Sequence, residues 1–387
     1  MTLHARILAA WASLLLAAVL TVGPAATLVA QERVLRLRPA NAQLSAEFTQ
    51  IASIRELPDG RILIADRQEE RIVVADFATN SVADIGRTGR GPEEYSSVST
   101  IYSLGGDSSL LPDVQSRRWL ILKGATIVRT VSPNAPAVRA AGGTVLGADS
   151  RGFLLSRASV RLDDFRAAAN STVQLGTDST ALIRVVAASG AVDTIAKLGS
   201  GLTRMEAQLN DEGRPERITI TRPVLRVDDQ AHMFPDGWVA IARLQPYRVD
   251  WRSPDGRWIR GAPLPFREVR IDALEKAAYR KQQELLGRRV PSGLAEWAET
   301  VGPFLFPFPS ASLIGTPEGW LLIARPPTSE QFENRYDLVD RSGNRRAQVV
   351  LSVNERIVAV GSRGVYVVVT SEFGLETVRR HPWQNGP

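Results

Sequence analysis

The sequence contains no cysteine among its 387 residues. Disulfide bonds, a thioether-linked lipid anchor and cysteine metal sites are therefore excluded, and the fold must be stabilised by a packed core. Lysine is also scarce, with four residues, so the basic excess comes from arginine. The arginines are spread along the chain without basic runs, whereas a nucleic-acid-binding protein would gather them on one face. We therefore expect no nucleic acid as a partner.

Residues 1–30 have the layout of a secretory signal peptide. A short basic start precedes an uncharged run from Ile7 to Ala30, which is broken at Gly23-Pro24 and ends in small residues. We expect cleavage after Ala30 and export of residues 31–387 to the periplasm or beyond, with no later membrane span. The alternative is an uncleaved N-terminal membrane anchor, because 24 uncharged residues could cross a bilayer.

Glycine-centred turns recur between apolar, strand-like runs. Dipeptides of the Asp-Gly kind between such runs predict β-hairpins. The glycines of these first turns are 46, 46, 85, 82 and 45 residues apart. They are Gly60, Gly106, Gly152, Gly237, Gly319 and Gly364. Three of the intervals agree within one residue, and each of the two long ones equals one unit plus an insertion.

A second turn follows in each unit, near Asn80, Gly124, Gly190, Gly256, Gly343 and Gly374. Two hairpins per unit make a four-stranded antiparallel sheet, and six such units of ~45 residues are typical of a β-propeller. We therefore predict an all-β fold, a single six-bladed propeller over residues 31–387. We expect a strand at residues 32–37 (ERVLRL) to complete the last blade. A β-sandwich or two unrelated β domains, the alternative, would not predict regular turn spacing.

The stretch IGRTGRGPEEY, from Ile85 to Tyr95, combines three glycines with two arginines. A phosphate-binding glycine loop must run from a strand into the N-terminus of a helix. Here the stretch connects the last strand of the first unit to the first strand of the second. We interpret its glycines as a crossing between blades that requires positive φ values.

Residues 59–95 resemble an NHL-type repeat. The resemblance rests on a hydrophobic strand, Ala-Asp, Arg-Ile and a Gly-Arg-x-Gly-x-Gly-Pro linker that ends in Glu and an aromatic residue. It is closest to NHL-like six-bladed propellers of exported bacterial proteins. It implies a propeller fold and a binding role, and it supplies no catalytic residues.

Three insertions interrupt the regular spacing, at Val160–Ser179, Gly201–Thr219 and Asp272–Pro309. In an up-and-down blade the second-to-third turn and the link to the next blade lie on one face. All three insertions, together with IGRTGRGPEEY, are therefore expected on that face. Long loops inside a compact domain are usually functional.

The longest insertion is predicted to be helical over about residues 272–302. Asp272 and Glu275 have capping-box spacing, and a second short helix is expected after Ser292. Leu274, Ala277, Ala278 and Leu285 form an apolar stripe on the first helix. The insertion either plugs the open core of the ring or forms a lid over a ligand site at the channel mouth.

Arginine and aromatic side chains on this face suit carboxylated or phosphorylated ligands, through bidentate hydrogen bonds and stacking. The candidates are Arg67, Arg87, Arg90, Tyr95, Arg288, Arg289, Trp297 and Phe304. The sequence thus predicts an exported, monomeric, non-enzymatic propeller without a cofactor. Its ligand would be a small molecule, a glycan or a protein.

The alternative function is that of a metal-dependent hydrolase or lyase. Lactonase-like six-bladed propellers bind a metal at the axis through Asp, Glu and Asn, and one divalent ion would then be the cofactor. The available carboxylates are Asp66, Asp113, Asp149 and Asp340. We favour the interpretation that these carboxylates cap turns, because Asp readily accepts hydrogen bonds from nearby backbone N–H groups. No His cluster or nucleophile motif accompanies them, and no catalytic residue is assigned.

Overall fold

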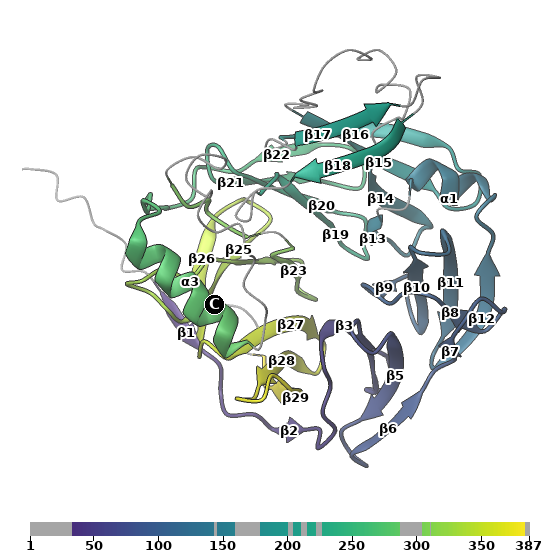
Figure 1. Cartoon of the computed structure of the whole chain (residues 1–387), viewed down its shortest axis with the longest axis horizontal. Helices are drawn as coiled ribbons and strands as arrows, with labels where there is room; N and C mark the ends of the chain where they lie inside the picture. Colours follow the sequence, from purple (N-terminus) through teal and green to yellow (C-terminus); the bar gives the residue numbers. More distant parts are fainter. Residues whose placement is uncertain are drawn as a thin grey trace, which may run out of the picture. The chain divides into compact units, whose positions relative to one another are not determined.

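The computed structural model of the chain shows a ring of six antiparallel blades (Figure 1). It describes residues 33–142, 145–158, 179–199, 204–209, 215–221, 227–286, 304–309 and 311–383. The signal peptide, the second helix after Ser292 and nearly all of the Val160–Ser179 insertion lie outside these residues. The predicted six-bladed propeller is confirmed. No helix among the described residues is long and apolar enough to cross a membrane.

The blades share one pattern, in which the first strand lies nearest the centre and each later strand lies one place further out (Figure 1). Blade one consists of β3 (Ile51–Glu56), β4 (Ile62–Asp66), β5 (Arg71–Asp76) and β6 (Ser81–Asp84). Blade two consists of β9 (Tyr102–Ser103), β10 (Ser108–Asp113), β11 (Arg118–Lys123) and β12 (Thr126–Val131). Blade three consists of β13 (Val145–Ala148), β14 (Phe153–Arg157), β15 (Ser179–Val186) and β16 (Val192–Gly199). Blade four consists of β19 (Gln230–Met233), β20 (Val239–Arg243), β21 (Arg248–Arg252) and β22 (Trp258–Arg260). Blade five consists of β23 (Leu313–Gly315), β24 (Leu321–Ala324), β25 (Asn334–Val339) and β26 (Arg345–Leu351). Blade six begins with β27 (Glu355–Gly361), β28 (Gly364–Thr370) and β29 (Glu376–His381).

The N-terminal segment closes the ring at two blades. β1 (Val34–Arg36) pairs in parallel with β26 as a fifth strand of blade five, and β2 (Ala42–Gln43) pairs with β29 as the fourth strand of blade six. The prediction that residues 32–37 complete the last blade was therefore wrong. Without β1 and β2, the outer edges of both β26 and β29 would present unpaired backbone groups, so either edge can accept a strand. Leu35 packs against the core cluster between blades five and six.

The core lies between neighbouring blades, and β4 shows why its sequence is continuously apolar. Ile62 and Ile64 pack toward blade six, whereas Leu63 and Ala65 pack toward blade two. Successive side chains of a strand point to opposite faces, so a strand covered on both faces needs apolar residues at every position. The ring that results is a rigid frame on which turns and insertions are held.

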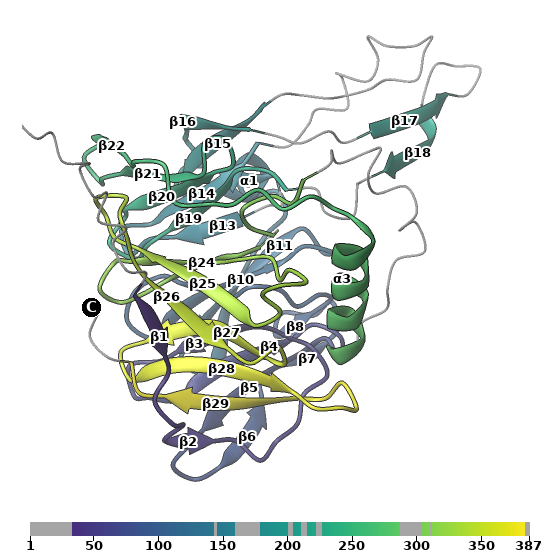
Figure 2. The same cartoon turned by 90° about the vertical axis from the view of Figure 1, so that its left-hand side faces the viewer.

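The described parts of the links between blades lie on one side of this ring (Figure 2). α3 (Ala273–Leu285) links blades four and five, and the hairpin of β17 (Arg204–Leu209) and β18 (Pro215–Thr221) links blades three and four. The strands β7 (Arg87–Thr88) and β8 (Glu94–Tyr95) pair in parallel in the link between blades one and two. A short helix that the sequence did not predict, α1 (Pro136–Ala141), links blades two and three. We call this side the insertion face.

Candidate ligand-binding site

α3 rests on the ring through a polar face. Its first turn is capped as expected, because Asp272 accepts hydrogen bonds from the backbone N–H groups of Leu274 and Glu275 at 2.8 and 3.0 Å. The buried side chains of the helix are Glu275 and Gln282, whereas Leu274 is 68% exposed. The apolar stripe seen in the sequence therefore faces away from the ring. The buried polar side chains of the helix form its hydrogen bonds to the ring.

α3 contacts blade five at the connection between β24 and β25 and at the first residue of β25. Glu275 accepts hydrogen bonds from the backbone N–H of Ser329 at 3.0 and 3.1 Å and from its hydroxyl group. The side-chain amide of Gln282 donates to Asn334 at 3.5 Å. The Lys281 ammonium lies 5.4 Å from the centre of the Phe332 ring. These contacts hold the helix over the insertion face.

A cavity of about 600 Å³ lies between α3, the return segment after the insertion, and the ends of blades five, six and one. Its polar walls include Gln50, Arg67, Glu275, Tyr279, Gln282, Gln283, Arg325, Asn334 and Arg356. Its apolar walls include Ile51, Ile271, Leu286, Leu305, Phe306, Phe308, Ile314, Tyr336 and Ile357. The volume and the mixture of apolar walls with a few polar groups are typical of small-molecule sites.

One end of the cavity, beside blades six and one, is basic. The backbone N–H of Arg67 donates to the carbonyl of Gln50 at 2.8 Å, and Nη2 of Arg356 donates to the carbonyl of Ile51 at 2.7 Å. The two arginines thus flank the start of β3. Arg356 also pairs with the buried Glu376 at 2.8 Å. Arg67 is exposed and forms no ion pair with any described residue.

The other end of the cavity, beside blades four and five, is apolar. Phe308 is fully buried against Tyr247 and Val227, and Phe306 packs on the same cluster. The side chain of Gln230 fixes this return segment, because it donates to the carbonyl of Pro309 at 2.6 Å and accepts from the backbone of Ser312 at 3.0 Å. The cavity therefore has a basic end and an aromatic end.

A third arginine, Arg325, lines the cavity at blade five. Its guanidinium group lies 5.0 Å from the ring centres of both Tyr247 and Phe266 and pairs with Asp337 at 2.8 Å. The carboxylate of Asp337 is fully buried. Arg325 is therefore held by protein groups, although it shares Asp337 with Arg345, which lies 3.2 Å from the other carboxylate oxygen.

Among the candidates that the structure describes, only Arg67 lines this cavity. Arg87 and Arg90 are exposed on the same face, in the link between blades one and two, and Arg87 pairs with Glu94 at 2.7 Å. Tyr95 is 2% exposed, and its hydroxyl accepts from the backbone N–H of Ile72. Phe304 is 42% exposed and bridges to Arg270. Arg288, Arg289 and Trp297 lie outside the described residues.

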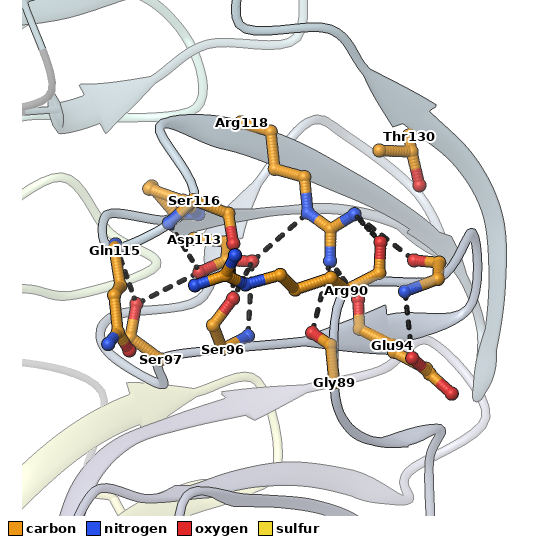
Figure 3. A network of polar contacts seen from close by, with 12 residues as sticks. Gly89, Arg90, Glu94, Ser96, Ser97, Asp113, Gln115, Ser116, Arg118 and Thr130 are labelled. Carbon is orange, nitrogen blue, oxygen red and sulfur yellow. Dashed lines mark hydrogen bonds and ion pairs between the residues drawn. The ribbon is translucent and has the colours of Figure 1, made fainter.

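The backbone carbonyls of the glycine-rich stretch IGRTGRGPEEY surround the guanidinium group of Arg118 (Figure 3). The guanidinium group of Arg118 donates to the carbonyls of Gly89, Arg90, Gly91 and Glu94 at 3.4, 2.9, 3.1 and 2.7 Å. Its Nε donates to Asp113 at 3.1 Å. A phosphate-binding loop would present N–H groups instead, so the interpretation as a structural crossing is supported. Gly86 and Gly89 adopt positive φ angles of 65° and 157°, whereas Gly91 does not.

The four carboxylates considered for a metal site each accept hydrogen bonds from nearby backbone. Asp66 accepts from Thr49 and Gln50, and Asp113 from Ser96. Asp149 accepts from Arg151 and Phe153, and Asp340 from Ser342 and Asn344. Asp66 and Asp113 end second strands, whereas Asp149 and Asp340 lie in turns of the opposite face. Within the described residues, no three His, Asp or Glu side chains form a group that could hold a metal ion.

Comparison with known proteins finds no matching family model and no matching curated protein. Among solved structures, a member of the DUF4221 family from Bacteroides vulgatus is 9% identical with a TM-score of 0.46, and the match covers 90% of this chain and 98% of that chain. The calcium-binding protein regucalcin from Agrobacterium tumefaciens is 12% identical with a TM-score of 0.39, covering 92% and 98%. A streptogramin B lyase is 10% identical with a TM-score of 0.37, covering 89% and 86%. These similarities are too low to transfer a ligand or an activity, and the resemblance to NHL-like propellers stays a prediction.

Proposed function

We propose that this chain is an exported, non-enzymatic propeller that binds a small organic molecule in the cavity beneath α3. The observation that carries the proposal is the helix itself. Its polar side faces the ring, and between this side and the blade ends lies a cavity of about 600 Å³ instead of a filled interface. A helix that only plugged the ring would be expected to bury its apolar residues. This arrangement favours the lid over the plug.

The chemistry of the walls supports binding more than catalysis. Guanidinium and amide groups fix the orientation of a ligand by directed hydrogen bonds, and the phenylalanines supply apolar contact. The carboxylates that a hydrolase or lyase would use are engaged by backbone N–H groups: those of Thr49 and Ser96, before the first strand of the blade, for Asp66 and Asp113, and those of their own turns for Asp149 and Asp340. No specific contact favours the enzymatic alternative, and we do not carry it further.

The test is to analyse the purified protein by native mass spectrometry for a co-purifying molecule. We expect an adduct in the wild-type protein and its loss in Ala52→Phe, which places a ring in the cavity wall at the start of β3. The matched control is Val128→Phe, an exposed position on β12 that should leave the adduct in place. The proposal fails if wild type neither retains a molecule nor gains thermal stability in a screen of organic ligands, or if both variants behave alike.

A further inference from the structure

We propose that the cavity selects an amphipathic monocarboxylate, with its carboxylate between Arg67 and Arg356 and its apolar body directed toward Phe306 and Phe308. This inference rests on the proposed function and narrows it to one chemical class. It is carried by the unequal ends of the cavity.

The basic end offers donors in the arrangement that a carboxylate requires. The backbone N–H of Arg67 donates to the carbonyl of Gln50, and the guanidinium group of Arg356 donates to the adjacent carbonyl of Ile51. Both residues therefore lie beside the start of β3 and line the cavity. All hydrogen bonds of Arg356 to described residues run from Nη2, which leaves its Nη1 donors without a partner among them. Guanidinium groups bind carboxylates through paired, charge-assisted hydrogen bonds.

The charge around this end favours a single negative charge over two. Two carboxylates stand behind the arginines and do not line the cavity. Glu376 pairs with Arg356, and Asp66 accepts from the backbone of Thr49 and Gln50. Three arginines (Arg67, Arg325 and Arg356) and one carboxylate (Glu275) line the cavity, so its wall is positive, whereas Glu376 and Asp66 nearby offset part of that charge. A dianion such as a phosphate monoester would gain less here, because the carboxylates behind the arginines repel its second charge.

Among the described residues, the far end offers no free partner for a second charged group on the ligand, because its one arginine, Arg325, is already paired with the buried Asp337. Phe306 and Phe308 belong to the return segment, and Phe308 is fully buried in the cluster between blades four and five. Burying a charge against these rings without a partner is costly. A ligand that spans the cavity therefore needs a charged head at blades six and one and an apolar body at blades four and five.

The experiment compares three probes that share one apolar body: phenylbutyrate, phenylbutanol and phenylbutyl phosphate. Binding to the full-length exported protein is measured by isothermal titration calorimetry. We expect phenylbutyrate to bind at least about tenfold more tightly than the alcohol, because a hydrogen bond to a charged group contributes about 1.5–3 kcal/mol. The phosphate should bind more weakly than the carboxylate.

The variant Arg67→Gln should weaken phenylbutyrate binding about tenfold and leave phenylbutanol binding unchanged. Arg87→Gln, an exposed arginine of the same face outside the cavity, is the matched control and should bind both probes as wild type does. Equal binding of acid and alcohol would overturn the carboxylate assignment and leave the proposed function standing. Tighter binding of the phosphate would overturn the single-charge argument. If no probe binds and no molecule co-purifies, both proposals fail.

Discussion

The carboxylate of Glu275 on α3 accepts two hydrogen bonds from the backbone N–H of Ser329, at 3.0 and 3.1 Å, across 54 residues of sequence. This contact ties the helix to blade five, and it buries a charge whose partners are one N–H and one hydroxyl group. Hydrogen bonds to charged groups contribute about 1.5–3 kcal/mol each at most. The position of the helix over the cavity therefore depends on few interactions.

We accordingly predict that Glu275→Ala releases α3 without unfolding the ring. Limited proteolysis should cut within α3 at least several-fold faster, while the melting temperature of the ring changes little, because the blade cores do not involve this residue. Glu284→Ala, at an exposed position of the same helix, is the control. Equal cleavage rates for the two variants would show that Glu275 does not hold the helix.

The ion pair between Arg118 and Asp113 leads to a prediction about stability. Both side chains are buried, with exposed fractions of 9% and 0%, and four backbone carbonyls of the glycine-rich link also depend on Arg118. Removing one partner of a buried pair costs about 3–5 kcal/mol. Arg118→Met should therefore lower the free energy of unfolding, measured with urea, by that amount.

The control for this prediction is Arg87→Met. Arg87 pairs with Glu94 in the same link, but its side chain is 81% exposed. Pairs of this kind contribute at most about 1 kcal/mol. Similar losses in the two variants would contradict the role assigned to the loop carbonyls.

The glycines of this link are predicted to differ in their tolerance of substitution. Gly86 adopts φ of 65°, and an added Cβ would lie 2.5 Å from the carbonyl oxygen of Glu93. Gly91 has no positive φ, and its nearest contact is with the flexible side chain of Glu94 at 3.0 Å. Gly86→Val should cost at least about 1–3 kcal/mol from backbone strain, and Gly91→Val should cost less. Thermal unfolding of both variants measures the difference, and the reverse order would refute the assignment.

The blade count could be predicted because each hairpin leaves a local mark in the sequence. A tight turn needs positive φ, and glycines supply it at Gly60, Gly152, Gly237 and Gly319, with φ between 82° and 95°. The face of the insertions followed from strand parity alone. These features depend on residues close together in the chain.

The cavity and the ring closure depend on distant residues and left no such mark. Arg356 lies at the start of β27 and reaches the start of β3, 305 residues away in sequence. The strand at Val34–Arg36 could be recognised as a strand, but its pairing with the outer edge of β26 joins residues from opposite ends of the chain. The orientation of α3 could not be predicted either, because the helix turns the polar residues Glu275 and Gln282 toward the ring instead of its apolar stripe.

The last prediction concerns acid stability and His232 on β19. Its ring packs edge-on against Phe234, with centroids 4.8 Å apart, and a Cβ at Gly315 would lie 2.5 Å from its Nε2. Burial lowers the pKa of His232 from 6.5 to about 4. The unfolded chain then binds a proton in the range from about 6.5 down to about 4, whereas the folded chain does not. The stability contributed by the neutral ring is complete above 6.5 and is lost progressively as the pH falls toward about 4.

At about pH 5 this loss amounts to about 2 kcal/mol relative to neutral pH, since one pKa unit corresponds to about 1.4 kcal/mol. Urea unfolding of the wild type at neutral pH and at about pH 5 should therefore show a larger decrease than unfolding of His232→Gln, which cannot take up the proton. The comparison uses only the difference between the two pH values, so a constant cost of the glutamine does not affect it. If both proteins lose the same stability between these pH values, the acid sensitivity belongs to other groups and the burial of His232 is not its cause.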